Sequence, residues 1–308
     1  MEWEEIEVGD PGPCQIRLRQ EGAGLNFIDV YHRTGLYPQA MPFTPGVEGA
    51  GVVEAVGDEV SNVSVGDRVA YGGPIGGYAE VRLIDAEKVV RLPDAISTEQ
   101  AAAMMLQGMT AQMLLRQVYA VKTGDTILIH AAAGGVGLIV CQWAKALGAT
   151  VIGTVGSDEK AALAHAHGCD HPIVYTRQDF VAEVDRITGG AKLPVVYDSV
   201  GKDTFLKSLD CLRPRGLMVG FGNASGAPDP MSPNVLSQKG SLFMTRPTLY
   251  NYTSTRDELE KTANDLFDVV ASGKVKIEVK QRFALRDAAE AHRALEARQT
   301  SGSTVLTV

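Results

Sequence analysis

The segment 126–155 constrains the fold of this chain more than any other. A short apolar run at 126–130 leads into a turn of small residues and glycines at 131–137, and an apolar helical stretch then continues to Gly148. A second apolar run, ATVIGTV, follows directly. This order predicts a strand, a glycine turn, a helix and a second strand, which together form one βαβ unit.

The glycines of the turn indicate a phosphate-binding site. A tight turn out of a parallel strand needs the backbone freedom of glycine, and a pyrophosphate approaches main-chain N–H groups only where no Cβ intervenes. The pattern departs from G-x-G-x-x-G because Val140 stands at the third glycine position, so it is better written Ala131-x-x-Gly134-x-x-Gly137. A glycine turn can also be purely structural, but the flanking strands and helix favour dinucleotide binding.

The composition excludes several classes of protein. The 308 residues are enough for about two domains, and 45% of them are hydrophobic, which predicts a large core. The formal net charge of −8 argues against a general nucleic-acid binder, and no apolar run reaches about 20 residues. The acidic start MEWEEIEVGD lacks the apolar region of a signal peptide, so we expect a cytoplasmic protein. The four cysteines include no C-x-x-C pair.

Two kinds of pattern divide the chain. Residues 1–100 carry short strands and glycine turns typical of a β-rich domain, and a helix capped by Ser97 is expected at 99–105. Strands and helices then alternate, which predicts a doubly wound parallel sheet of about six strands at 126–130, 150–154, 172–174, 194–198, 215–220 and 241–245. The expected helices lie at 110–119, 136–147, 158–167, 178–187, 202–212 and 233–238. The tail, with a helix at 254–271, a strand at 281–284, a helix at 287–298 and a strand at 303–308, is expected to rejoin the first domain. The predicted domains are therefore 1–109 with 247–308, and 110–246.

Three segments of the chain carry recognisable motifs. The glycine turn with its flanks reads G-D-x-x-L-x-x-x-A-A-G-G-x-G-x-x-x-x-Q-x-x-K from Gly124 to Lys145, and the other segments are N-F-I-D at 26–29 and P-G-V-E-G-A-G-V-V at 45–53. These motifs resemble the signature and elements of the zinc-free quinone oxidoreductase and ζ-crystallin family of the medium-chain dehydrogenase/reductase superfamily. The resemblance implies an α/β fold, with a GroES-like β-rich catalytic domain and a Rossmann-type dinucleotide-binding domain.

The resemblance also bears on metal binding. Related alcohol dehydrogenases hold a catalytic zinc through a Cys and a G-H-E motif, whereas this chain has Asn26 and Gly46-Val47-Glu48 at the matching positions. Valine cannot bind a metal and asparagine is a poor zinc ligand, so we expect no metal. Asp29 and Glu48 are interpreted as structural, as a cap or a brace of a turn.

The resemblance implies NADPH as the cofactor. The second strand ends in Thr154-Val155-Gly156-Ser157 without the acidic residue that bonds the ribose of NAD, and Lys160 follows within reach of a 2′-phosphate. In the family, residues matching Lys160, Tyr175 and Arg298 surround that phosphate, and Ser157 can add a hydroxyl. Taken singly, each of the three is better interpreted as a solvated surface side chain, but together, at matched positions, they favour NADPH. The other expected cofactor contacts are Thr110, Ala133, Gly134, Gly135, Val136, Gly137, Ser199, Phe221, Gly222 and Phe243.

Three residues are candidates for the acceptor site. By resemblance, Asn26, Tyr31 and Tyr37 line the cleft for nicotinamide and acceptor, although both tyrosines also suit packing at a domain edge. The implied activity is NADPH-dependent reduction of quinones. Two alternatives stay open: an enal or enone C=C reductase, and a non-catalytic NADPH- or RNA-binding role like that of a crystallin. We also expect a homodimer formed through the edge strand near 242–245.

Overall fold

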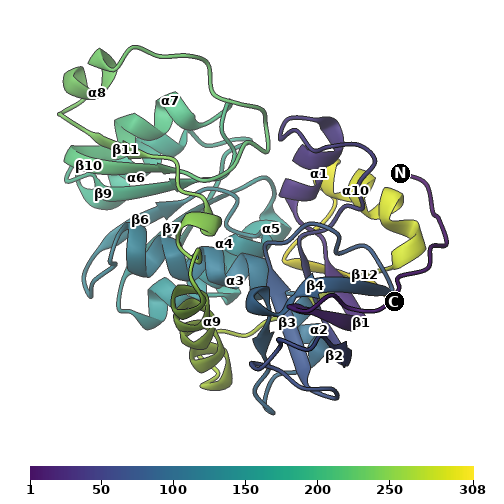
Figure 1. The fold of residues 1–308 in the computed structure, drawn as a ribbon. Helices are drawn as coiled ribbons and strands as arrows, with labels where there is room; N and C mark the ends of the chain where they lie inside the picture. Colours follow the sequence, from purple (N-terminus) through teal and green to yellow (C-terminus); the bar gives the residue numbers. More distant parts are fainter. The chain divides into compact units, whose positions relative to one another are not determined.

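Two units are formed by different parts of the chain. In the computed structural model, which describes residues 1–308, the first unit comprises Met1–Thr110 and Tyr252–Val308, and the second comprises Ala111–Asn251. Both are labelled by element in Figure 1. None of the helices combines the length and the apolar character that a membrane-spanning helix requires.

The first unit contains a seven-stranded sheet in the order β12-β13-β1-β2-β3-β5, with β4 paired to β1. Its core forms because inward residues alternate along the strands: Ile16 and Leu18 of β1 are fully buried against Val53 and Val69. The tail strands pair as expected from the sequence, since β13 lies between β12 and β1. The strands are β1 (Gln15–Gly24), β2 (Glu48–Val56), β3 (Arg68–Gly72), β4 (Val81–Asp85), β5 (Val90–Arg91), β12 (Val279–Ala284) and β13 (Ser303–Thr307).

Two helices of the first unit begin at capping side chains that accept a backbone hydrogen bond. Ser97 accepts a hydrogen bond from the backbone N–H of Gln100, which confirms the predicted cap. Thr255 and Glu258 form a reciprocal capping box at the start of α9. The helices are α1 (Phe27–Thr34), α2 (Thr98–Ala102), α3 (Met105–Gln112), which continues to the boundary of the units, α9 (Arg256–Ala271) and α10 (Ala288–Glu296), with 3₁₀ turns η1 (Ala86–Lys88) and η5 (Leu285–Asp287).

The second unit contains a parallel six-stranded sheet in the order β11-β10-β9-β6-β7-β8. Figure 1 labels β6, β7, β9, β10 and β11 of this sheet. All six predicted strands are present, as β6 (Thr126–Ile129), β7 (Thr150–Val155), β8 (His171–Val174), β9 (Leu193–Asp198), β10 (Leu212–Gly220) and β11 (Phe243–Thr245). The order reverses between β6 and β9, so right-handed crossovers place α4 and α5 on one face of the sheet and α6 and α7 on the other. A ligand crevice is expected at the carboxyl ends of β6 and β9, where the order reverses.

The helices of the second unit agree with the sequence except at two places. They are α4 (Gly135–Ala146), α5 (Asp158–Ala166), α6 (Phe180–Thr188), α7 (Phe205–Ser208) and α8 (Asn234–Gln238), with 3₁₀ turns η3 (Leu209–Cys211) and η4 (Leu249–Asn251). The helix expected at 202–212 is thus much shorter. The helix expected at 110–119 is the end of α3 followed by a π-helix, η2 (Met113–Val118). There the N–H of Tyr119 and the hydroxyl of Tyr197 both donate to the carbonyl of Leu114.

Candidate functional site

Asn26 lies at the centre of a buried polar cluster in the first unit. It is the N-cap of α1, its backbone N–H donates to Asp29 Oδ2 at 2.8 Å, and its side chain is 8% exposed. Its amide nitrogen donates to Glu48 Oε2 at 2.7 Å, and Gln107 Nε2 donates to Asn26 Oδ1 at 3.1 Å. Asn26, a candidate residue of the acceptor site, is therefore hydrogen-bonded through both the nitrogen and the oxygen of its side-chain amide.

Two glycines, Gly24 just before the first family segment and Gly46 within the second, leave the space that this cluster occupies. A Cβ on Gly24 would lie 2.1 Å from Glu48 Oε2, and a Cβ on Gly46 would lie 2.4 Å from the ring of Tyr78. Gly46 also has a φ of 89°, which an L-residue rarely adopts. The glycines at 24 and 46 therefore allow two buried polar side chains to pack against the backbone.

Two carboxyl groups are fully buried here. Burial raises the pKa of Asp29 to about 7 and the pKa of Glu48 to about 8. Asp29 Oδ2 also accepts from the hydroxyl of Tyr78 at 3.0 Å, and that hydroxyl lies 3.0 Å from His292 Nε2. Burial lowers the pKa of His292 to about 4, so this histidine is neutral at pH 7. The interpretation of Asp29 as a cap and of Glu48 as a brace agrees with these contacts, since Glu48 Oε1 accepts from the N–H of Leu106 at 2.8 Å.

The two candidate tyrosines lie against each other at the end of α1. The ring centroids of Tyr31 and Tyr37 are 5.1 Å apart in an edge-to-face arrangement, and Tyr37 donates its backbone N–H to the carbonyl of Tyr31 at 3.1 Å. Gly35, with φ of 77°, ends α1 and turns the chain back. Asn26 and the tyrosines thus belong to opposite ends of one helix.

The glycine turn of the second unit has the form that the sequence predicts. Gly134 is the N-cap of α4, and its N–H donates to the carbonyl of Ala131 at 2.9 Å. A Cβ on Gly137 would lie 2.3 Å from that same carbonyl oxygen, so no larger residue fits. Ala133 is buried, whereas Gly134, Gly135 and Val136 are half-buried at the start of the helix.

Three predicted phosphate contacts lie together at the end of β7. The hydroxyl of Ser157 accepts from the N–H of Lys160 at 3.3 Å and caps α5. The hydroxyl of Tyr175 lies 3.1 Å from the place where a Cβ on Gly156 would be. Asp158 forms a two-point ion pair with Arg177 at 2.5 and 2.9 Å, which lowers the pKa of Asp158 and offsets its charge.

The expected cofactor contacts that follow the glycine turn in the sequence of the second unit are only partly brought together. Ser199, Phe221 and Gly222 meet at the carboxyl ends of β9 and β10, where a Cβ on Gly222 would lie 2.5 Å from the carbonyl of Ser199. Phe243 pairs with Leu217, back along β10, and is 61% exposed.

Two further candidates belong to the first unit. Thr110 Oγ1 donates to the carbonyl of Leu106 at 2.7 Å, as a helical threonine commonly does. Arg298 follows α10 with a φ of 60°.

Sequence reasoning missed the partners of the candidate residues. Gln107, Ser303, Tyr78 and His292 complete the cluster around Asn26, but they come from distant parts of the chain and no local motif indicates them. In the second unit, His130 lies between Thr154 and Ser208, with 2.8 Å to each hydroxyl.

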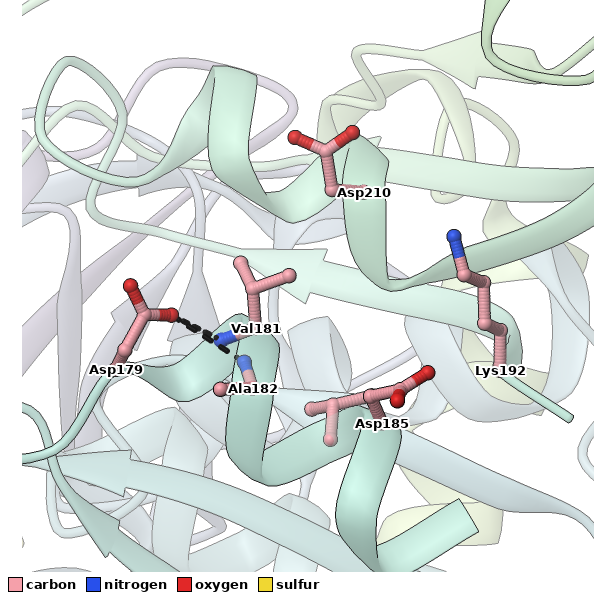
Figure 2. Close-up of a pocket in the computed structure, with 7 residues that line it drawn as sticks. Asp179, Val181, Ala182, Asp185, Lys192 and Asp210 are labelled. Atoms are coloured by element: carbon pink, nitrogen blue, oxygen red, sulfur yellow. Dashed lines mark hydrogen bonds between the residues drawn. The ribbon is translucent and has the colours of Figure 1, made fainter. Parts of the chain in front are cut away.

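The remaining features of the structure are its potential metal ligands and a cavity along α6. No group of three or more His, Cys, Asp or Glu side chains is arranged to hold a metal ion. Figure 2 shows a cavity of about 350 Å³ along α6, lined by Asp179, Val181, Ala182, Val184, Asp185, Lys192 and Asp210. Lys192 and Asp210 precede β9 and β10, so this cavity includes residues at the amino ends of the strands, away from the glycine turn.

A β-rich unit together with a parallel sheet and its glycine turn defines a dehydrogenase of the medium-chain dehydrogenase/reductase class. Residues 12–94 match the alcohol dehydrogenase GroES-like domain, and residues 135–268 match the zinc-binding dehydrogenase family. The chain is 55% identical to the quinone oxidoreductase of Pseudomonas aeruginosa over 308 residues, which cover 99% of this chain and 95% of the relative. It is 50% identical to the 2-haloacrylate reductase of a Burkholderia species, covering 99% and 94%.

A solved structure agrees with these relatives. The Escherichia coli quinone oxidoreductase complexed with NADPH superposes with a TM-score of 0.97 at 49% identity, covering 99% of this chain and 95% of the other. The chain belongs to the quinone oxidoreductase family.

Proposed function

We propose that this chain reduces quinones with NADPH as the electron donor. The glycine turn carries the proposal, because a Cβ on Gly134 would meet one atom within 4 Å, whereas Gly137 is closely packed against the backbone of Ala131 and Ala132, an arrangement that suits a bound pyrophosphate. The acceptor class rests on the relatives, several of which are named quinone oxidoreductases at 50–55% identity. The second unit would bind the dinucleotide and the first the acceptor, with the domain boundaries predicted from the sequence at 109/110 and 246/247.

The residues present fit NADPH. The start of α4 offers N–H groups and a positive dipole end to the pyrophosphate. Ser157, Lys160 and Tyr175 form a corner that suits a 2′-phosphate, and the nearby Asp158 is paired with Arg177. Arg298 remains a candidate for the same phosphate by resemblance, as do Thr110 and Phe243 for other parts of the dinucleotide. The Escherichia coli relative, solved with NADPH, supports this assignment.

The chemistry asks little of the protein beyond binding and orientation. NADPH, when bound, supplies the hydride. Asn26 would orient the nicotinamide or the acceptor oxygen through its amide, Tyr37 would stack on a ring or donate its hydroxyl, and Tyr31 would support Tyr37. A quinone accepts hydride readily, and water can protonate its oxygen. We propose that no zinc is needed, since Val47 has no ligand atom and the amide of Asn26 is held by Glu48 and Gln107.

A second candidate is reduction of a C=C bond conjugated to a carbonyl. The 50% identity with a 2-haloacrylate reductase favours it specifically. Both candidates use the same dinucleotide site and differ only in the acceptor.

The deciding experiment is NADPH consumption by the purified protein with a small quinone, an α,β-unsaturated aldehyde and 2-chloroacrylate side by side, with NADH as the control donor. Rapid quinone-dependent loss of NADPH, weak with NADH, is the expected result. Faster loss with the aldehyde or chloroacrylate would replace quinone reduction by the second candidate. No loss with any acceptor, despite tight binding of NADPH, would refute a catalytic role and favour the binding protein.

A homodimer and a cytoplasmic location complete the proposal. Edge strand β11 has one neighbour in the sheet, and it exposes Phe243 and Met244 by 61% and 44%. An apolar edge of this kind is suited to pairing with a second copy.

A further inference from the structure

A continuous chain of hydrogen bonds crosses the interior of the first unit and includes Asn26. The N–H of Leu106 donates to Glu48 Oε1 at 2.8 Å, and the amide of Asn26 donates to Glu48 Oε2 at 2.7 Å. Gln107 then donates to Asn26 Oδ1 at 3.1 Å, and Ser303 Oγ donates to Gln107 Oε1 at 2.8 Å. Glu48, Asn26, Gln107 and Ser303 are each 8% exposed or less.

The chain of hydrogen bonds runs in one direction, because each group donates to the next. Only the carboxylate of Glu48, at one end of it, can set that direction. An amide can turn by 180° and exchange its donor and acceptor sides, and a serine hydroxyl can either donate or accept. An ionised carboxylate only accepts. Since one oxygen of Glu48 faces a backbone N–H, the other must receive the NH₂ of Asn26, and the carbonyl of Asn26 must then face Gln107.

We propose that Glu48 and Gln107 are positioning residues that fix the direction of the Asn26 amide, and that this direction determines activity. The inference rests on the proposed role of Asn26 at the nicotinamide or acceptor. Asn26 has a second N–H and a second carbonyl lone pair beyond those that Glu48 and Gln107 engage. The direction of the amide determines the side of Asn26 on which this N–H and this lone pair face a ligand.

The reversed chain is equally well hydrogen-bonded once the carboxylate is neutral. A neutral Glu48 donates to Asn26 Oδ1, Asn26 then donates to Gln107 Oε1, and Gln107 donates to Ser303 Oγ. The titratable groups that act on Glu48 are Asp29, Tyr71 and Tyr78. Further from Glu48, His292 and Arg33 act on Tyr78, and Arg82 lies over the ring of Tyr71. Burial raises the pKa of Glu48 to about 8, so the two directions exchange within the range of an activity assay.

The test replaces the carboxylate without changing its shape. In Glu48→Gln, the amide at position 48 accepts from Leu106 and donates to Asn26, so the reversed direction is permanent. At a pH above 8, where the wild-type carboxylate is ionised, we expect quinone reduction to fall at least tenfold, thermal stability to be retained, and the wild-type dependence of activity on pH near 8 to disappear. The double variant Glu48→Gln with Gln107→Glu restores the buried charge on the other side of Asn26. It also stabilises the reversed direction, so it is expected to stay as inactive as the single variant.

The matched control is Asp29→Asn, which removes the other buried carboxylate beside Asn26. One oxygen of Asp29, Oδ2, accepts from both Asn26 N and Tyr78, so an amide oxygen in its place keeps both bonds and leaves the Asn26 side chain as it was. We expect its activity to stay within about threefold of wild type.

A second measurement does not depend on activity. In two-dimensional ¹⁵N–¹H spectra of the cofactor-free protein, the side-chain NH₂ signal of Asn26 is assigned by its absence in Asn26→Ala. It is expected to move to the same position in Glu48→Gln as in wild type at low pH, and to stay unmoved in Asp29→Asn.

Three outcomes would overturn the inference. Full activity of Asn26→Ala would refute the role of Asn26, and with it the positioning. Loss of activity in Asn26→Ala with unchanged activity and pH profile in Glu48→Gln would refute the positioning alone. Recovery of activity in the double variant would show that Glu48 supplies only a buried charge.

Discussion

Replacement of Gly137 by alanine tests the glycine turn most directly. The new Cβ would lie 2.3 Å from the carbonyl oxygen of Ala131 and 2.7 Å from the carbonyl carbon of Ala132. Real Cβ atoms do not approach closer than 3.0 Å, so the backbone must move by about 0.7 Å. A rotamer change cannot relieve this clash, because both partners are backbone atoms.

The magnitude follows from two opposing effects. Overpacking typically destabilises by about 1–3 kcal/mol, and a backbone clash belongs at the upper end of that range. Alanine gains about 1 kcal/mol over glycine inside a helix, which offsets part of the strain. We expect a net loss of about 2 kcal/mol, which lowers the Tm by about 4–8 °C in a protein of this size.

The matched control is Gly134→Ala in the same turn. Gly134 has an ordinary φ of −80°, and its Cβ would lie 3.2 Å from the nearest atom. The carbonyl of Ala131 must shift by a few tenths of an ångström, which is much less than the shift that Gly137→Ala requires, and we expect a Tm within about 2 °C of wild type. The added methyl group would nevertheless stand where the pyrophosphate approaches the backbone, so NADPH binding should weaken at least tenfold.

Differential scanning calorimetry and titration calorimetry with NADPH measure both effects. The expected pattern is loss of stability and binding in Gly137→Ala, and loss of binding alone in Gly134→Ala. Wild-type melting of Gly137→Ala would refute the packing argument. Wild-type NADPH affinity of Gly134→Ala would refute the approach of phosphate to this turn.

Three further predictions concern other parts of the chain. Lys160→Ala should raise the KM for NADPH about tenfold, as expected for a lost charge-assisted contact, and leave the KM for NADH unchanged; an equal effect on both would contradict the 2′-phosphate assignment. Phe243→Asp should convert a dimer to a monomer in sedimentation at micromolar concentration, whereas Leu206→Asp, at another exposed apolar position of 49%, should not; a monomeric wild type would end this proposal. Burial lowers the pKa of His130, so the unfolded chain binds a proton below pH about 6.5 that the folded chain does not. Urea unfolding should therefore show wild type losing stability relative to His130→Gln as the pH falls from 6.5 to 5, by up to about 1.4 kcal/mol per pH unit, and parallel curves would show that His130 is not the group that titrates.

The central strands of the second unit, β6, β7 and β9, could be predicted because each is an apolar run buried on both faces. The runs expected at 150–154 and 194–198 are strands Thr150–Val155 and Leu193–Asp198, shifted by one residue at an end. The start of the helix expected at 202–212 was wrong for a tertiary reason, since helical structure begins only at Phe205 and then continues to Cys211. The buried carboxylate of Asp198 binds the N–H groups of Val200 and Gly201 and the hydroxyl of Thr204, which keeps this segment in a loop.

The site could be predicted only as far as local motifs extend. Asn26 was selected by its place in a recognisable segment, and Lys160 by its position after the second strand. Gln107 lies 81 residues from Asn26, and Ser303 lies 196 residues from Gln107, so their contacts depend on the folding of the whole first unit. A glutamine on an apolar helix carries no sequence signal that identifies which amide it will orient.

In the second unit, as in the cluster around Glu48, a group that can only accept hydrogen bonds sets the direction of the neighbouring hydrogen bonds. The hydroxyl of Ser208 has one proton and donates it to the carbonyl of Thr204 at 2.8 Å, so it must accept from Nε2–H of His130. The other nitrogen of a neutral His130 then carries no proton and accepts from the hydroxyl of Thr154 at 2.8 Å. His130 follows β6, and Thr154 lies near the end of β7. The carbonyl of Thr204, which can only accept, thus fixes the tautomer of His130. The hydrogen bond of this tautomer to Thr154 connects the two strand ends between which the glycine turn begins.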